Sequence, residues 1–221
     1  MAERRSLMLR IWFALLLLTG TAGIASAHPH VFVDASEEIV FDPEGRMTAI
    51  RHIWQFDEAF TAFAIQGLDA DGDGKLSDAE LAPLAQVNVD SLKDYAYFTL
   101  LKVGGKHVRV TSPSEYWLDF HDGRLTLFYT LPLEAPTAPG RHTTLEVFDP
   151  EYFVAFNFVK DKTIHLADAP ANCKASFRPP HELDDATMAR LAALPQDQRD
   201  LPEDLADAAS SLASLITVKC T

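Results

Sequence analysis

A twelve-residue segment at 69–80 constrains the fold of this chain more than any other stretch. It reads Asp-Ala-Asp-Gly-Asp-Gly-Lys-Leu-Ser-Asp-Ala-Glu, with carboxylates at its first, third and fifth positions. A glycine stands at the sixth position, where the chain must turn sharply, and a glutamate stands at the twelfth. This spacing is typical of the calcium loop of an EF-hand, which lies between two helices.

The chemistry of Ca²⁺ explains this spacing, because the ion takes about six to eight oxygen ligands and holds together carboxylates that otherwise repel one another. The alternative is an Asp/Gly-rich surface turn. Only one such loop is present and the chain has 4 methionines, so we expect a structural rather than a signalling Ca²⁺. The predicted ligands are side-chain oxygens and one backbone carbonyl: Asp69, Asp71, Asp73, Lys75 (carbonyl), Ser77 and Glu80.

The first 27 residues have the three-part layout of a secretory signal peptide. Three arginines precede an apolar run over 11–18, and the small residues Ala25 and Ala27 form a cleavage site. The alternative is a membrane anchor, for which the apolar run is short. We therefore expect cleavage after Ala27, export to the periplasm if the source is a bacterium, and no membrane span after cleavage.

Export bears on the two cysteines, Cys173 and Cys220. In an oxidising compartment such a pair usually forms a disulfide, which here would tie the carboxyl-terminal tail to the body of the protein. Closing so long a loop would stabilise the fold by about 4 kcal/mol. Two free thiols or a thiolate metal site are the alternatives.

Composition excludes several classes of protein. The chain has 19 Lys+Arg against 32 Asp+Glu, a formal charge of −13, whereas nucleic-acid binding needs a basic surface. A hydrophobic fraction of 48% is that of a globular protein. The sequence contains no G-x-S-x-G, no H-E-x-x-H and no glycine-rich phosphate loop, so we do not expect an enzyme.

Hydrophobic periodicity predicts an α+β fold, with mainly antiparallel β structure in sandwich-like hairpins. Residues 28–221 are expected to form one domain, with the EF-hand helix–loop–helix inserted at about 57–97. Alternating segments predict four hairpins, at 28–56, 100–110, 116–131 and 144–159.

The carboxyl-terminal part of the chain shows weaker patterns. Residues 163–166 suggest one further strand, and the proline-containing stretch 167–182 suggests irregular structure. Short amphipathic helices are expected over 184–194 and 202–215.

Cleavage of the signal peptide would create a nitrogen-rich terminus. The chain would begin with His-Pro-His at 28–30, whose α-amine and imidazoles suit Ni²⁺, Co²⁺, Cu²⁺ or Zn²⁺. If the first hairpin turns at 43–44, its register places His30 opposite Asp57, so His28, His30 and Asp57 are a candidate transition-metal site. Solvent-exposed histidines at a frayed terminus are the alternative.

Several short motifs together resemble one bacterial family. They are the segments at 28–34, 54–58, 69–80 and 148–153, together with the two cysteines. The mature chain is similar over nearly its whole length to a periplasmic family of unknown function labelled "ABC-type uncharacterised transport system, periplasmic component". Members are often encoded beside, or fused to, permeases of the nickel/cobalt type. The resemblance implies an accessory role in divalent-metal handling, with a membrane metal permease as partner.

These observations predict an exported calcium-binding accessory protein for divalent transition-metal transport or homeostasis. The alternative is a structural or interaction module that Ca²⁺ rigidifies and that docks a membrane partner, without a transition-metal site. A copper-dependent oxidase is a third hypothesis, which would require redox turnover with Cu²⁺. Dependence of metal affinity on the free amine of His28 separates the first hypothesis from the second.

Overall fold

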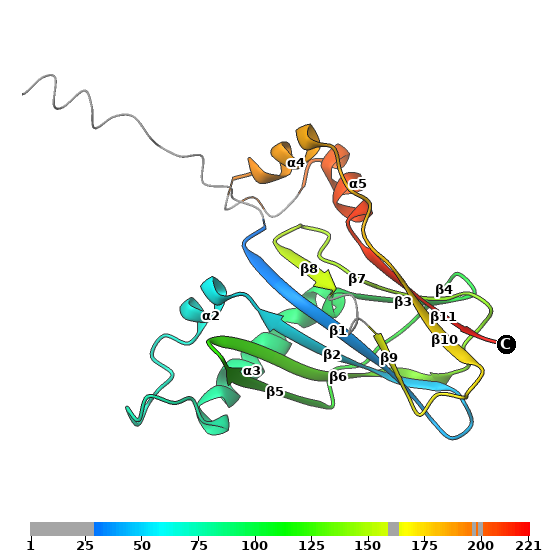
Figure 1. Cartoon of the computed structure of the whole chain (residues 1–221), viewed down its shortest axis with the longest axis horizontal. Coiled ribbons are helices and arrows are strands. Elements are labelled where there is room, and N and C mark those ends of the chain that lie inside the picture. Colours follow the sequence, from blue (N-terminus) through cyan, green and yellow to red (C-terminus); the bar gives the residue numbers. More distant parts are fainter. Residues whose placement is uncertain (1–28, 159–163, 196–197, 199–200) are drawn as a thin grey trace, which may run out of the picture.

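The computed structural model describes residues 29–158, 164–195, 198 and 201–221. Two β-sheets form the body of the protein (Figure 1). With four α-helices in the described residues, the fold is α+β and its sheets are mostly antiparallel, which confirms the fold class expected from the periodicity. The expected signal peptide at 1–27 and His28 lie outside the described residues.

The larger sheet has six strands in the spatial order β5-β6-β2-β1-β8, and β9 also pairs with β1. Strands β8 and β9 run parallel to β1, along its first and second halves, whereas the other pairs are antiparallel. The strand bounds are β1 (Val31–Phe41), β2 (Met47–Phe56), β5 (Glu115–His121), β6 (Arg124–Thr137), β8 (Val154–Phe158) and β9 (Ile164–Ala167).

The smaller sheet has five antiparallel strands in the order β10-β11-β7-β3-β4. Cys173 faces Cys220 across β10 and β11, and the two cysteines form a disulfide, which confirms the predicted bond. The strand bounds are β3 (Thr99–Val103), β4 (Lys106–Val108), β7 (Thr143–Val147), β10 (Cys173–Arg178) and β11 (Ser214–Cys220).

Alternation of apolar and polar residues assigns the faces of the strands. Every second residue of β1, from Val31 to Phe41, is buried, and those between them are partly or fully exposed. Buried side chains of the two sheets belong to one apolar core, with Trp54 and Leu127 from the larger sheet and Leu145 and Ile216 from the smaller one. Each large apolar side chain buried in this way contributes about 1.5–3 kcal/mol.

The helices fall into two groups. Helix α2 (Glu58–Ala64), helix α3 (Asp78–Leu92) and the 3₁₀ helix η1 (Lys93–Phe98) follow one another between β2 and β3. Helices α4 (Asp185–Ala192) and α5 (Glu203–Ser211) lie together at the top of Figure 1, where a small separate apolar cluster forms around Leu191 and Leu205.

The predicted fourth hairpin is wrong, because β7 and β8 belong to different sheets. The side chain of Asp149, which follows β7, accepts hydrogen bonds from the backbone N–H groups of Glu151 (2.9 Å), Phe153 (3.0 Å) and Val154 (2.9 Å). These bonds hold a turn that leads the chain out of the smaller sheet and into the larger one, where β8 pairs with β1.

The carboxyl-terminal prediction also needs correction. Residues 173–178, expected to be irregular, form strand β10, and the helix expected over 202–215 ends at Ser211. The following segment, Ser214–Cys220, alternates between buried and more exposed residues as strand β11 and pairs with both β10 and β7. Both partners of β11 are distant in sequence, so local periodicity gives no sign of the pairing.

Candidate metal centre

Local sequence explains why a loop separates α2 from α3. Helix α2 begins after Asp57, whose carboxylate accepts the backbone N–H of Phe60. The helix ends at Ile65, its carboxyl-terminal cap residue. Helix α3 begins after Ser77 with a reciprocal capping box, in which Ser77 and Glu80 each bond the backbone of the other. The acidic segment therefore lies between a fixed helix end and a fixed helix start.

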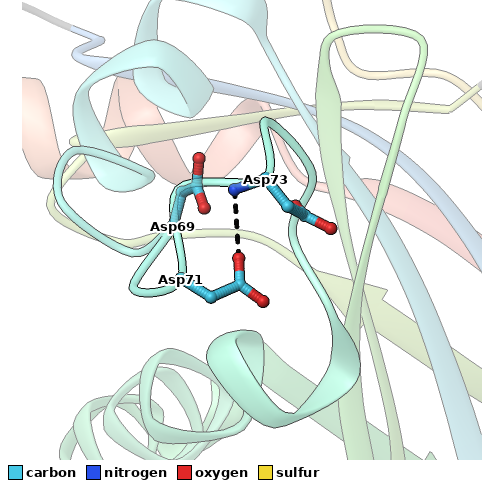
Figure 2. Close-up of side chains that lie close together, drawn as sticks. All are labelled: Asp69, Asp71 and Asp73. Carbon is cyan, nitrogen blue, oxygen red and sulfur yellow. Dashed lines mark hydrogen bonds between the residues drawn. The ribbon is translucent and has the colours of Figure 1, made fainter.

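Three aspartates of this segment converge. Ligand atoms of Asp69, Asp71 and Asp73 lie within 4.8 Å of one another, and all three residues are exposed (Figure 2). In the described part of the chain they are the one group of three or more His, Cys, Asp or Glu side chains so placed. Three like charges at this spacing repel, so the arrangement favours a bound cation with a preference for hard oxygen ligands.

The carboxylates also shape the loop that carries them. Asp69 accepts the N–H groups of Gly72 (2.8 Å) and Gly74 (3.0 Å), and Asp71 accepts that of Asp73 (3.1 Å), the contact drawn in Figure 2. Gly72 and Gly74 have φ values of +73° and +80°, a region that residues with a side chain rarely adopt. The two glycines therefore allow the chain to curl around its own carboxylates.

Glu80 connects the two ends of the loop. Its carboxylate accepts the N–H of Ala70 (2.7 Å) and both the N–H (2.9 Å) and the hydroxyl (2.8 Å) of Ser77. Hydrogen bonds from Ser77, and then from Ala70, lower the pKa of Glu80 to about 2, so this side chain is an anion at neutral pH. Glu80 thus adds negative charge to the loop, although it is outside the three-aspartate group.

The structure corrects the expected geometry around Asp57. A turn at Asp42–Arg46 and a bulge beside Phe41 shift the register of the first hairpin, so Asp57 lies opposite Phe32 rather than His30. Both carboxylate oxygens of Asp57 accept backbone N–H groups, Oδ1 from Phe60 and Oδ2 from Phe32, each at 2.8 Å. Asp57 therefore joins β1 to the start of α2.

His30, the second residue of the candidate transition-metal site, lies elsewhere. It is partly buried, and its ring centroid is 4.6 Å from that of Phe153. Its backbone N–H donates to the backbone carbonyl of Phe153 (2.8 Å). His30 thus packs against the turn that Asp149 holds, rather than against Asp57. The third residue, His28, lies outside the described residues, and the two that are described, His30 and Asp57, do not face each other.

Glu37 and His52 form a buried ionisable pair that the sequence analysis does not predict. The two residues face each other across β1 and β2, with His52 Nδ1 2.5 Å from Glu37 Oε2, and both side chains are fully buried. Trp54 Nε1 donates to the other carboxylate oxygen, Glu37 Oε1, at 3.2 Å. The sequence contains a sign of this pair, because strict alternation places the charged residue Glu37 on the apolar face of β1.

The pair continues into a chain of hydrogen bonds. The Thr99 hydroxyl donates its proton to the carbonyl of Tyr97 (2.7 Å). The same hydroxyl lies 3.3 Å from His52 Nε2, so in that contact the Nε2–H group of His52 is the donor. The other ring nitrogen, Nδ1, is the one that lies beside the Glu37 carboxylate. Burial, and then the charge of Glu37, raise the pKa of Tyr129, whose ring stacks on His52 at 4.4 Å.

Comparison with known proteins assigns the family. Residues 13–220 match the family described as protein of unknown function (DUF1007). The chain belongs to this family. The DUF1007 match covers both sheets, both helix groups and the acidic loop, and it supplies no activity for any of them.

Two relatives are likewise uncharacterised. An "uncharacterized 15.5 kDa protein in trpE 3'region" of Spirochaeta aurantia is 33% identical over 98 residues, which are 44% of this chain and 70% of the relative. An uncharacterized protein of Haemophilus influenzae is 22% identical over 182 residues, 81% of this chain and 85% of the relative. No helix among the described residues of the DUF1007 chain is long and apolar enough to cross a membrane.

Proposed function

We propose that this protein is exported and binds one Ca²⁺ ion at 69–80 in the manner of an EF-hand. The observation that carries the proposal is the convergence of the carboxylates of Asp69, Asp71 and Asp73 within 4.8 Å. In the proposed complex, Glu80 turns a carboxylate toward the ion, Ser77 contributes directly or through a water, and Lys75 contributes its backbone carbonyl. Ca²⁺ suits such a flexible all-oxygen site better than Mg²⁺, which demands near-ideal octahedral geometry.

The contacts of α2 and α3 suggest what the ion does. The hydroxyl of Thr61, which is buried in α2, accepts the N–H of Leu125 at the start of β6 (3.1 Å). Helix α3 buries Leu81, Ala85 and Val89 in the core of the protein. In our proposal Ca²⁺ holds the ends of these two helices at a fixed separation and so stabilises their packing on the larger sheet.

Removal of Ca²⁺ should lower the melting temperature without abolishing the β-sheet circular-dichroism signal. A weak extracellular site has a Kd of about 10⁻⁴–10⁻³ M, so about 10 mM Ca²⁺ stabilises the fold by roughly 1.4–2.7 kcal/mol. For a chain of this length this is a shift of roughly 3–10 °C. Thermal melts of the chain that begins at His28, in Ca²⁺ and in EDTA, measure the shift.

The variant Glu80→Gln should lose this shift and still fold, because glutamine also serves in a capping box. Asp78→Asn is the matched control, because it removes the same charge from the same loop. Asp78 occupies the tenth position of the loop and is not a predicted ligand. A melting temperature of the unsubstituted protein that is equal in Ca²⁺ and EDTA would refute the stabilising role.

We further propose that the protein is a periplasmic accessory to divalent transition-metal transport, and a binding protein rather than an enzyme. The motifs at 28–34, 54–58, 69–80 and 148–153, together with the two cysteines, support this proposal. They resemble those of a family often encoded beside nickel/cobalt-type permeases, which makes a membrane metal permease the proposed partner. His28 and His30 are the proposed ligands for Ni²⁺, Co²⁺, Cu²⁺ or Zn²⁺. Asp57 can join them only through lone pairs that its two backbone N–H partners leave available.

Titration of the mature chain with these four ions tests the transition-metal proposal. One tight adduct is expected, and it should be lost in His28→Ala and when one residue is added before His28, because the proposed site uses the free α-amine. His165→Ala is the matched control, since that exposed histidine lies on β9 and outside the proposed site. Unchanged affinity after the amino-terminal extension would contradict the amine-dependent site.

An interaction module without a transition-metal site is the second candidate function, and a specific observation favours it. Two apolar residues on the helices beside the acidic loop are strongly exposed, Phe63 on α2 at 73% and Val87 on α3 at 59%. Exposed apolar residues next to a Ca²⁺-stabilised loop suit the docking of a membrane partner. Ca²⁺ binding with no transition-metal adduct in the titration above would favour this candidate.

A further inference from the structure

A cavity of about 240 Å³ lies between the larger sheet, helices α2 and α3, and the segment after β7. Its wall combines residues from β1, β2 and β6 with Phe60 of α2 and with Asn88, Ser91 and Leu92 of α3. The cavity is distinct from the acidic loop. Six of its lining residues carry aromatic rings: Trp54, Phe56, Phe60, Tyr95, Phe98 and Phe153.

The aromatic rings support one another. Phe98 has its ring centroid 6.4 Å from that of Trp54 and 5.4 Å from that of Tyr95, and Phe56 lies 4.7 Å from Phe60. Trp54 is held in addition by its hydrogen bond to Glu37. The aromatic wall is therefore preorganised by core packing, which lowers the ordering cost when a ligand binds.

Two carboxylates, those of Asp149 and Glu151, belong to the same wall. Asp149 is only 5% exposed, and the three backbone N–H groups that it accepts, from Glu151, Phe153 and Val154, fix its position. Carboxylates beside apolar rings generate a negative potential that water screens poorly. The cavity wall thus combines aromatic side chains with two carboxylates.

We propose that this cavity binds a small organic cation of the quaternary or alkylated ammonium class. Aromatic faces attract such cations through the ring quadrupole, and recognition of quaternary ammonium groups by several rings is a recurrent use of this interaction. The nearby carboxylates add electrostatic attraction, whereas a strongly hydrated inorganic cation gains little from apolar walls. The volume is below the roughly 300–1,000 Å³ of pockets for drug-sized ligands, so the cation is compact.

Binding of choline compared with 3,3-dimethyl-1-butanol tests the proposal, because the two molecules have the same shape and differ in the positive charge. The mature chain is used with Ca²⁺ present and with Trp117→Phe, which leaves Trp54, in the cavity wall, as the one tryptophan after residue 27. We expect choline to change the fluorescence of Trp54 and to release heat in calorimetry. The neutral molecule should bind about tenfold more weakly or not at all.

Two variants test the cavity itself. Glu151→Gln should weaken choline binding about tenfold, and Ser91→Phe, at an exposed helix position, should abolish it by filling the cavity. Glu44→Gln, in the exposed turn between β1 and β2, removes the same charge and should leave binding unchanged. Circular dichroism and melting temperature establish that each variant is folded.

Three results would overturn the proposal: no binding of choline by the folded protein, equal affinities for choline and its neutral isostere, or an affinity that folded Ser91→Phe retains. None of these results bears on Ca²⁺ binding at 69–80, so the two proposals can fail separately.

Discussion

Replacing Glu37 by leucine should lower the free energy of unfolding by about 3–5 kcal/mol, because the change leaves the buried His52 without its carboxylate partner. For a protein of this size the loss corresponds to a fall in melting temperature of roughly 6–20 °C. His52→Leu should have an effect of the same order, since it leaves the Glu37 carboxylate with only the Trp54 N–H. Denaturant titration at neutral pH measures both losses.

Glu38→Leu is the matched control, since Glu38 is the next residue of β1 and pairs with Arg51 at the surface. Exposed ion pairs contribute about 0–1 kcal/mol, so this variant should stay close to the unsubstituted protein. The double variant Glu37→Leu/His52→Leu should recover most of the loss, because an apolar pair suits this buried position. Equal effects of Glu37→Leu and Glu38→Leu would contradict the buried pair.

Removal of the disulfide should cost about 4 kcal/mol, because Cys173 and Cys220 are 47 residues apart in sequence and their bond restricts the unfolded chain. In the folded protein the bond joins β10 to β11, and β11 in turn pairs with β7. Reductant should therefore lower the melting temperature of the oxidised protein by roughly 8–16 °C.

The variant Cys173→Ser/Cys220→Ser should melt at the temperature of the reduced protein and should not respond to reductant. The serine pair retains the strand pairing through its backbone, so the comparison isolates the covalent bond. If the oxidised and reduced proteins melt together, the disulfide does not contribute to stability.

Local patterns and the chemistry of the cysteines predicted part of the structure. The alternation in Val31–Phe41 and Met47–Phe56 predicted the first hairpin, and the acidic spacing predicted the positions of Asp69, Asp71 and Asp73. The two cysteines, together with the expected signal peptide, predicted the disulfide. In each case the determining residues act within one turn, one hairpin or one covalent bond.

Long-range pairing and exact register could not be predicted in this way. Strand β11 pairs with β7, more than sixty residues away, and no turn motif marks that pairing. The Asp149 side chain redirects the chain between sheets through three backbone N–H groups, although its sequence context resembles a hairpin turn. The bulge beside Phe41 shifted Asp57 away from His30, because one extra residue in β2 changes the register of the whole pair.

The buried Glu37–His52 pair could have been predicted. Both residues fall at inward positions of strands whose alternation was recognised, and the direct pairing of Glu37 with His52 follows from the observed register. The alternation of β2 places His52 on the same buried face as Trp54. A charged residue at an inward position of a strand is a sign of a buried polar partner on the neighbouring strand.

The most direct test of the central claim is native mass spectrometry of the chain that begins at His28, titrated with Ca²⁺ in the presence of excess Mg²⁺. The account predicts one Ca²⁺ adduct that saturates at millimolar concentration, persists in Asp78→Asn and is lost in Glu80→Gln. An adduct that Glu80→Gln retains in full, or no Ca²⁺ adduct in the folded unsubstituted protein, would contradict it.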